Sequence, residues 1–230
     1  MPPPIAYTTS NITKQWQQAV TATVVSKATA ILNSTNMTGG SGPSGDIQPP
    51  GWGDGTCPAH HNRGHLIGNN LGGPGNVANN LVTLTAGTNH PFMYEFEDAV
   101  RRYVLANKGL NFTYTVECEY DGYQATSGFP IPGAGGNPFC LFPAPNALRL
   151  SLQGAGPITL GELAQYFPTP PTDLGAAAFY TSLYVPNGGY KLYSSGSHLA
   201  NSCWAVTPSP HAVKVQANAA AYARKLGHIP

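Results

Sequence analysis

A short stretch in the first half of the chain gathers residue types that can carry out hydrolysis. It contains a histidine (His65), an asparagine in a Thr-Asn-His-Pro run (Asn89), a glutamate eight residues later (Glu97) and an arginine four residues beyond that (Arg101). Three of the five arginines of the whole chain lie in residues 63–102. A general base, an oxygen ligand, a carboxylate and cationic groups within about forty positions supply what metal-assisted hydrolysis of a phosphodiester needs.

Secondary-structure signals place these residues on a strand, a turn and a helix. Residues 82–85 alternate and are mostly β-branched, which predicts a short strand. Asn89 and Pro91 form a helix-start signal, and apolar residues then recur at helical spacing. We therefore expect a helix over residues 91–108, with Asn89 as its cap. His65 lies upstream in an extended segment, so the order is strand, strand and helix.

This ordered set of residues resembles the DNA/RNA non-specific endonucleases, especially their DNA-entry-nuclease-like and bacterial toxin branches. The matching residues are Arg63-Gly64-His65-Leu66-Ile67, Leu71-Gly72-Gly73, Asn80-Leu81-Val82, Asn89 and Glu97. The resemblance covers residues 57–120. It implies an α+β fold, with a ββα-metal nuclease core on an antiparallel sheet, flanking helices and long loops.

The resemblance also implies a role for each residue of the central set. His65 would be the general base that activates water, and Asn89 the direct protein ligand of Mg²⁺, for which Mn²⁺ would be a substitute. Glu97 would hold water molecules bound to the metal, and this would be its part in catalysis. The implied activity is a metal-dependent endonuclease that cleaves DNA, RNA or both without sequence selectivity.

Arginines and supporting amides complete the expected site. Arg63 or Arg101 would neutralise the phosphate in the transition state, and both, together with Arg102, would bind the nucleic acid. Asn80 would have a supporting role at the turn before the second strand.

Two departures from the family pattern leave other functions open. Asn62, the second expected supporting residue, stands where the family motif usually begins with Asp, and an amide brings no charge. No arginine precedes Arg63; only Lys14 and Lys27 do. The alternative is therefore a catalytically inactive, nuclease-derived binding module, and a third possibility is a structural domain of a secreted particle.

Composition favours an exported or translocated protein. Charged residues make up 9% of the 230-residue chain, against about 25% in typical globular domains. The chain contains no run of eighteen apolar residues, which a membrane span would need. No signal peptide is visible at the start of the chain. We expect a secreted toxin or effector delivered into target cells, and an antibacterial toxin implies a cognate immunity or inhibitor protein.

The chain divides into two regions by composition. Residues 1–50 are expected to hold an N-terminal helix over residues 10–32, where apolar residues recur at helical spacing, followed by a Gly/Ser/Pro-rich linker. Residues 51–230 are expected to form the nuclease domain, with the core motif at 57–120 and a C-terminal extension of unknown role at 121–230. Residues 111–119 alternate and predict a strand that extends the sheet carrying His65.

The four cysteines, Cys57, Cys118, Cys140 and Cys203, allow three pairings. Cys57 and His60 have the spacing of half a zinc site, but no second matching pair follows. At least one disulfide is the favoured prediction for a chain with few charges and many loops, and free buried thiols are the alternative.

Overall fold

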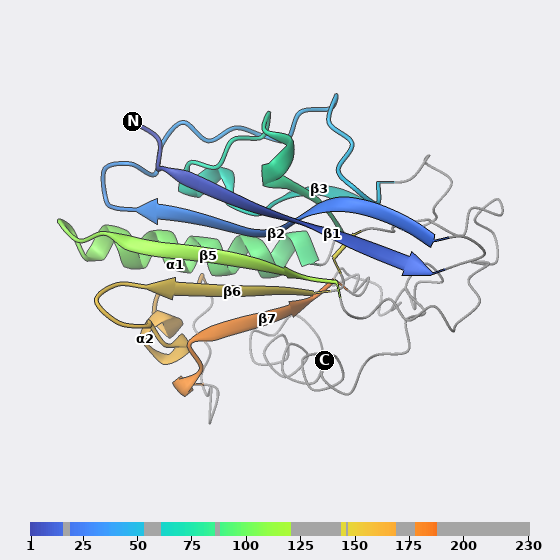
Figure 1. Ribbon diagram of the computed structural model, residues 1–230. Helices are drawn as coiled ribbons and strands as arrows, with labels where there is room; N and C mark the ends of the chain where they lie inside the picture. The colour runs from blue at the N-terminus through green and yellow to red at the C-terminus, as the bar shows by residue number, and fades with distance from the viewer. Residues whose placement is uncertain are drawn as a thin grey trace, which may run out of the picture.

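A five-stranded antiparallel sheet, in the order β1-β2-β5-β6-β7, forms the framework of the protein (Figure 1). The structure is a computed structural model that describes residues 1–15, 19–52, 61–85, 88–120, 144–145, 147–168 and 178–187. The strands are β1 (Ile5–Gln15), β2 (Ala19–Leu32), β5 (Phe112–Glu119), β6 (Ala147–Gln153) and β7 (Ser182–Pro186). A separate two-stranded antiparallel ribbon consists of β3 (His61–His65) and β4 (Leu81–Thr85).

Helices cover one face of the large sheet. The helix α1 (Tyr94–Ala106) runs along this face, and the shorter α2 (Leu160–Ala164) lies near one end of it (Figure 1). Phe96 of α1 lies 6.3 Å from Tyr114 of β5 and 6.2 Å from Phe167, measured between ring centroids. Side chains of β5 alternate between buried and half-buried, so one face of the strand packs against the helices. This arrangement confirms the expected α+β class with an antiparallel sheet.

The predicted helix over residues 10–32 is wrong, because this segment forms the β1–β2 hairpin. Ala28, Ala30 and Leu32 are fully buried, whereas Ile31 is 38% exposed. That alternation belongs to a strand. Ser26 is an extra residue, a bulge between the pairs Thr8–Lys27 and Thr9–Val25, and it shifts the alternation so that Val25 rather than Ser26 is buried. Since β2 pairs with β5, the hairpin belongs to the same sheet as the strand that follows α1. The domain boundary at residue 50 stays a prediction.

The helix of the site begins later than its sequence signals indicate. Thr88–Met93 forms helical turns that are kinked at His90, whose backbone is extended (φ −145°, ψ 121°). His90 precedes Pro91, and a residue before proline is driven out of the helical region by steric clash. The cap position of α1 is therefore Met93, and the expected capping role of Asn89 is wrong.

Two strand predictions near the site have different outcomes. The strand expected at 82–85 is confirmed as part of β4, and the strand expected at 111–119 is confirmed as β5. However, β5 lies in the large sheet, whereas His65 lies in the β3–β4 ribbon. The expectation of one shared sheet is therefore wrong.

Some expectations fall partly or wholly outside the described residues. Cys118, on β5, has a buried free thiol, and burial raises its pKa to about 12. Cys57, Cys140 and Cys203 lie outside the described residues, so a disulfide among them stays a prediction. In the described part of the chain, no helix has the length and apolar character needed to cross a membrane.

Candidate active site

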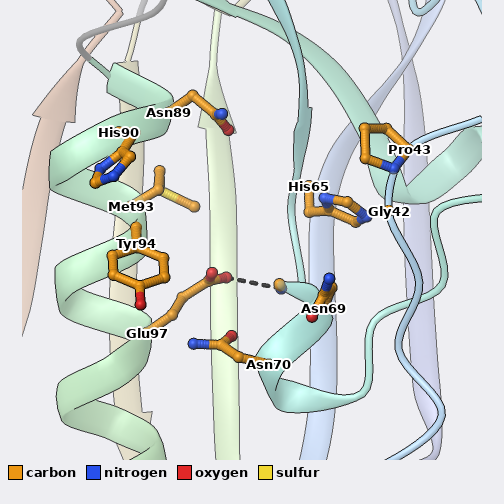
Figure 2. A pocket seen from close by; sticks show the side chains of 11 residues that line it. Gly42, Pro43, His65, Asn69, Asn70, Asn89, His90, Met93, Tyr94 and Glu97 are labelled. Carbon is orange, nitrogen blue, oxygen red and sulfur yellow. Dashed lines mark hydrogen bonds between the residues drawn. The ribbon is translucent and has the colours of Figure 1, made fainter. Parts of the chain in front are cut away.

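A pocket of about 260 Å³ lies between the start of α1 and the turn that follows β3 (Figure 2). His65, Asn89 and Glu97 all line it, although they come from a strand end, a kinked turn and a helix. The structure therefore brings together the three residues on which the sequence prediction depends. The remaining lining residues are Gly42, Pro43, Gly68, Asn69, Asn70, His90, Met93 and Tyr94.

His65 is held by a loop from the N-terminal part of the chain. Its Nε2 lies 3.0 Å from the carbonyl oxygen of Ser41. A carbonyl only accepts, so Nε2 carries the hydrogen, and the neutral ring keeps a lone pair on Nδ1. Burial lowers the pKa of His65 below 6.5, and the hydrogen bond to Ser41 opposes this shift. The imidazole is therefore neutral at pH 7.

Glu97 is buried beneath the pocket and makes one close backbone contact. The N–H of Gly68 donates a hydrogen bond of 2.7 Å to Glu97 Oε1. A Cβ at position 68 would overlap the Glu97 carboxylate, so glycine is the residue that permits this approach. Burial raises the pKa of Glu97 to about 8, and the Gly68 hydrogen bond counteracts part of the rise.

The oxygen donors of the pocket suit a hard divalent cation. Asn89 supplies an amide oxygen and Glu97 a carboxylate, while the buried Oδ1 of Asn70 has no hydrogen-bond partner among the described residues. Mg²⁺ prefers oxygen ligands and keeps several of its waters, so it needs few direct protein ligands. Within the described residues, no cluster of three or more His, Cys, Asp or Glu side chains forms a cage for a metal. The donor set therefore fits a hydrated cation held by amide and carboxylate oxygens.

The two expected supporting residues differ in placement. Asn80 is fully buried; its Oδ1 accepts from Ile67 N at 3.0 Å, and its Nδ2 donates to Ile67 O and Pro74 O at 2.9 and 3.1 Å. These bonds fix the chain directly after His65. Asn62 is half-buried on β3, opposite Leu84 of β4, and is not among the residues that line the pocket.

The three expected arginines lie outside the pocket lining. The guanidinium of Arg63 stacks 4.2 Å above the Trp52 ring and donates to Ile47 O at 2.6 Å and Gly45 O at 3.0 Å. Arg102 forms a 2.8 Å ion pair with Asp98. Arg101 is half-buried on α1, one turn after Glu97.

Sequence reasoning missed Ser41, Gly68 and Asn70. Ser41 and His65 are 24 residues apart, and Gly68 and Glu97 are 29 apart, so no local spacing relates them. The run Gly68-Asn69-Asn70-Leu71-Gly72-Gly73 was a usable signal, because small and amide residues directly after the candidate base are typical of a tight turn.

Comparison with known proteins places these features in a family. The family model of the DNA/RNA non-specific endonucleases matches residues 9–129, more than half of the chain. None of the curated proteins is significantly similar in sequence.

Several solved nuclease structures are weakly similar. NucA from Streptococcus agalactiae, with magnesium bound, is 17% identical over 89% of this chain and 79% of its own, with a TM-score of 0.43. The Sda1 nuclease with bound zinc is 17% identical over 67% of this chain and 79% of its own, with a TM-score of 0.41. A structure described as an extracellular nuclease is 14% identical over 85% of this chain and 92% of its own, with a TM-score of 0.41. From the family match over more than half of its length, the chain belongs to the DNA/RNA non-specific endonucleases and is a nuclease that hydrolyses phosphodiester bonds.

Proposed function

We propose that the protein is a Mg²⁺-dependent endonuclease, active also with Mn²⁺, that cleaves DNA, RNA or both without reading sequence. The observation that carries this proposal is the convergence of His65, Asn89 and Glu97 on one pocket (Figure 2). Contacts to phosphate and sugar position a nucleic acid without distinguishing bases, so slight sequence selectivity is expected.

His65 is the proposed general base. Its Nε2 hydrogen is directed to the Ser41 carbonyl, so Nδ1 is the nitrogen that takes the proton from the attacking water. Burial keeps the ring neutral at pH 7, which is the protonation state a base requires.

Asn89 and Glu97 are the proposed residues that hold the cation. Asn89 would provide the direct protein oxygen, and Glu97 would hold its hydration shell from the buried side of the pocket. When bound, the cation stabilises the negative charge that develops on the phosphate and the leaving oxygen.

Arg101 is the proposed residue for neutralising phosphate charge. It lies one turn beyond Glu97 on α1, whereas Arg63 is engaged by two backbone carbonyls and the Trp52 ring. Arg63 and Arg102 are assigned to weaker contacts with the nucleic-acid backbone.

Delivery outside the producing cell is a further part of the proposal. A chain with only 9% charged residues suits an exported protein, and the toxin branch of the family would pair such a nuclease with an inhibitor protein. Co-purification of the nuclease with a protein encoded beside its gene tests the pairing with an inhibitor independently of the chemistry.

The catalytic assignment is tested with three single variants of the full chain. His65→Ala should lose roughly 10²–10⁴ in single-turnover cleavage of plasmid DNA while keeping its affinity for the cation. Asn89→Ala should lose both cleavage and cation affinity, because it removes the direct ligand. Glu97→Gln should fall between these two, because the amide keeps the shape of the carboxylate without its charge. Isothermal titration with Mg²⁺ beside the cleavage assay, with and without EDTA, provides the measurements.

Two results would overturn the residue assignment, and a third would overturn the proposed activity. Loss of cation binding in His65→Ala would make His65 a ligand rather than a base. Cleavage at the parental rate by all three variants would place the active site elsewhere. No cleavage by the folded parent with either cation would favour the inactive binding module, for which Asn62 in place of Asp is the supporting observation.

A further inference from the structure

Asn70 has a buried polar atom that the fold itself does not use. Its Oδ1 is buried and has no hydrogen-bond partner among the described residues. An unpaired buried acceptor costs free energy unless a bound water or ion satisfies it. Asn70 lines the same pocket as Asn89 and Glu97, so a ligand of that pocket is within its reach.

The local backbone fixes Asn70 in this position. Asn70 is the central residue of a single 3₁₀ turn, Asn69–Leu71, closed by hydrogen bonds from Leu71 N to Gly68 O and from Gly72 N to Asn69 O, both 3.0 Å. Gly72 ends the turn in the left-handed region (φ 91°), and the Leu71 side chain is fully buried. The turn therefore presents Asn70 from a rigid support.

The direction of the side chain points to the cation site. In Figure 2 the Asn70 amide extends from the turn toward α1, with its oxygen on the side of the Glu97 carboxylate. The N–H of Gly68, two residues earlier, donates to that same carboxylate. Asn70 and Glu97 thus offer acceptor oxygens from opposite walls of one pocket.

We propose that Asn70 is an additional positioning residue for the divalent cation, with Oδ1 accepting a hydrogen bond from the cation's hydration shell opposite Glu97. A hydrated cation presents only hydrogens to its surroundings, so it needs acceptors on every side, and Asn70 supplies one on the wall that has no carboxylate. The inference rests on the proposed function, because it assumes that the cation binds at Asn89 and Glu97.

The neighbouring Asn69 is a matched control. It has the same side chain, lines the same pocket and is exposed. Mn²⁺ binding to the full chain without nucleic acid, followed by electron paramagnetic resonance, reads the cation site without using activity. Asn70→Ala should weaken Mn²⁺ binding by about 10–100-fold, the usual effect of losing a residue that supports a metal site. Asn69→Ala should leave the affinity unchanged, and Asn70→Asp, which keeps an acceptor at this position, should bind at least as tightly as the parent.

A second measurement separates this role from a structural one. In EDTA, Asn70→Ala should melt at or above the temperature of the parent, because it removes an unpaired acceptor. A clearly lower melting temperature would show that Asn70 supports the fold and would overturn the proposal. Parental Mn²⁺ affinity in Asn70→Ala, or equal weakening in Asn69→Ala, would also overturn it. If the folded parent itself fails to bind Mn²⁺, the proposed cation site fails, and this inference fails with it.

Discussion

Burial acts on His65 and Glu97 in the same direction, toward the uncharged form. The pKa of His65 is lowered and that of Glu97 is raised to about 8, each mainly by loss of contact with water. A neutral histidine is ready to accept a proton. A neutral glutamic acid carries no charge for a cation to balance, and it becomes a better partner for a cation once it ionises.

Cleavage should depend on pH through His65. Because the pKa of His65 lies below 6.5, the single-turnover rate at saturating Mg²⁺ should be level above pH 6.5. It should decline at more acidic pH, where the ring takes up a proton. A rate that is undiminished at pH 4.5 in folded protein would contradict the role of His65 as base.

Stability in the absence of cations should depend on pH through Glu97. The unfolded chain loses this proton near pH 4.5, whereas the folded protein holds it up to about pH 8. The contribution to stability is therefore fully present below pH 4.5 and is lost as the pH rises to about 8. Between pH 6.5 and 8 the Glu97 contribution to the free energy of unfolding should fall by up to ~2 kcal/mol. The unfolded chain also releases the His65 proton near pH 6.5, and this offsets a small part of the fall.

Urea unfolding in EDTA at pH 6.5 and 8 measures this loss. The control is Glu97→Gln, an amide that does not titrate and should show a smaller change between the two pH values. Equal changes in the parent and in Glu97→Gln would contradict the attribution to Glu97.

The spacing of residues in the sequence identified the three side chains that converge on the pocket. It did not identify the backbone groups that hydrogen-bond to two of them. His65, Asn89 and Glu97 follow from fixed offsets within one short stretch, and all three line the pocket. Ser41 and Gly68 act through backbone atoms, which every residue possesses, so their identity in the sequence gives no sign of the contact.

At the scale of elements, the loop before β3 determines how His65 is oriented. Residues 41–44 are tied to residues 73–75 by hydrogen bonds from Ser41 N to Gly73 O, from Ser44 N to Gly75 O and from Gly75 N to Ser41 Oγ. These bonds set the position of the Ser41 carbonyl. The loop therefore supports the proposed catalytic residue, although its Gly/Ser/Pro-rich composition predicts a linker.

Gly40→Ala tests this dependence. A Cβ at position 40 would overlap the backbone carbonyl of Asn69, so the loop must shift and take the Ser41 carbonyl with it. Cleavage should fall on the order of 10²-fold, the usual result of an ångström-scale misplacement in an active site. The control is Gly45→Ala, whose Cβ would meet no atom within 4 Å and which should cleave at the parental rate. Parental cleavage by Gly40→Ala would show that the loop does not orient His65.

The β1–β2 hairpin shows where element prediction failed and why. Apolar residues at 20, 24, 28 and 31 have helical spacing, but every second residue from 28 to 32 is also apolar. Pairing with β5 on one side and β1 on the other selects the strand, and no local sequence signal reports those partners. By contrast, α1 and β5 were predictable, because each has one clear period along its length.

At the scale of the whole molecule, Asn187 connects the large sheet to the β3–β4 ribbon. It is fully buried after β7, and its Nδ2 donates to Thr83 O on β4 at 3.0 Å and to Pro145 O at 2.8 Å. Thr83 lies 104 residues from Asn187 in the sequence. This one side chain therefore joins the strand beside His65 to the far edge of the sheet.

Asn187→Ala should destabilise the protein by about 1–3 kcal/mol, because two buried carbonyls lose a donor. Chemical denaturation followed by circular dichroism measures the change. Asn111→Ala is the control: Asn111 Oδ1 accepts from Asn33 at 3.2 Å in an exposed position, and its loss should change stability by less than ~0.5 kcal/mol. Equal effects of the two variants would contradict the connecting role of Asn187.

The pairing of Leu32 with Phe112 at the junction of β2 and β5 has a consequence for engineering. Every residue assigned to the site, from Ser41 to Arg102, lies in the segment between these two positions, so the site is one continuous insert whose ends meet at neighbouring points of a sheet. Adjacent ends are the geometry that domain insertion and transplantation require. The insert is not self-sufficient, however, because Phe96 packs near Tyr114 outside it. A host sheet that received residues 33–111 would have to offer an apolar face beneath α1 as well as two adjoining strand ends.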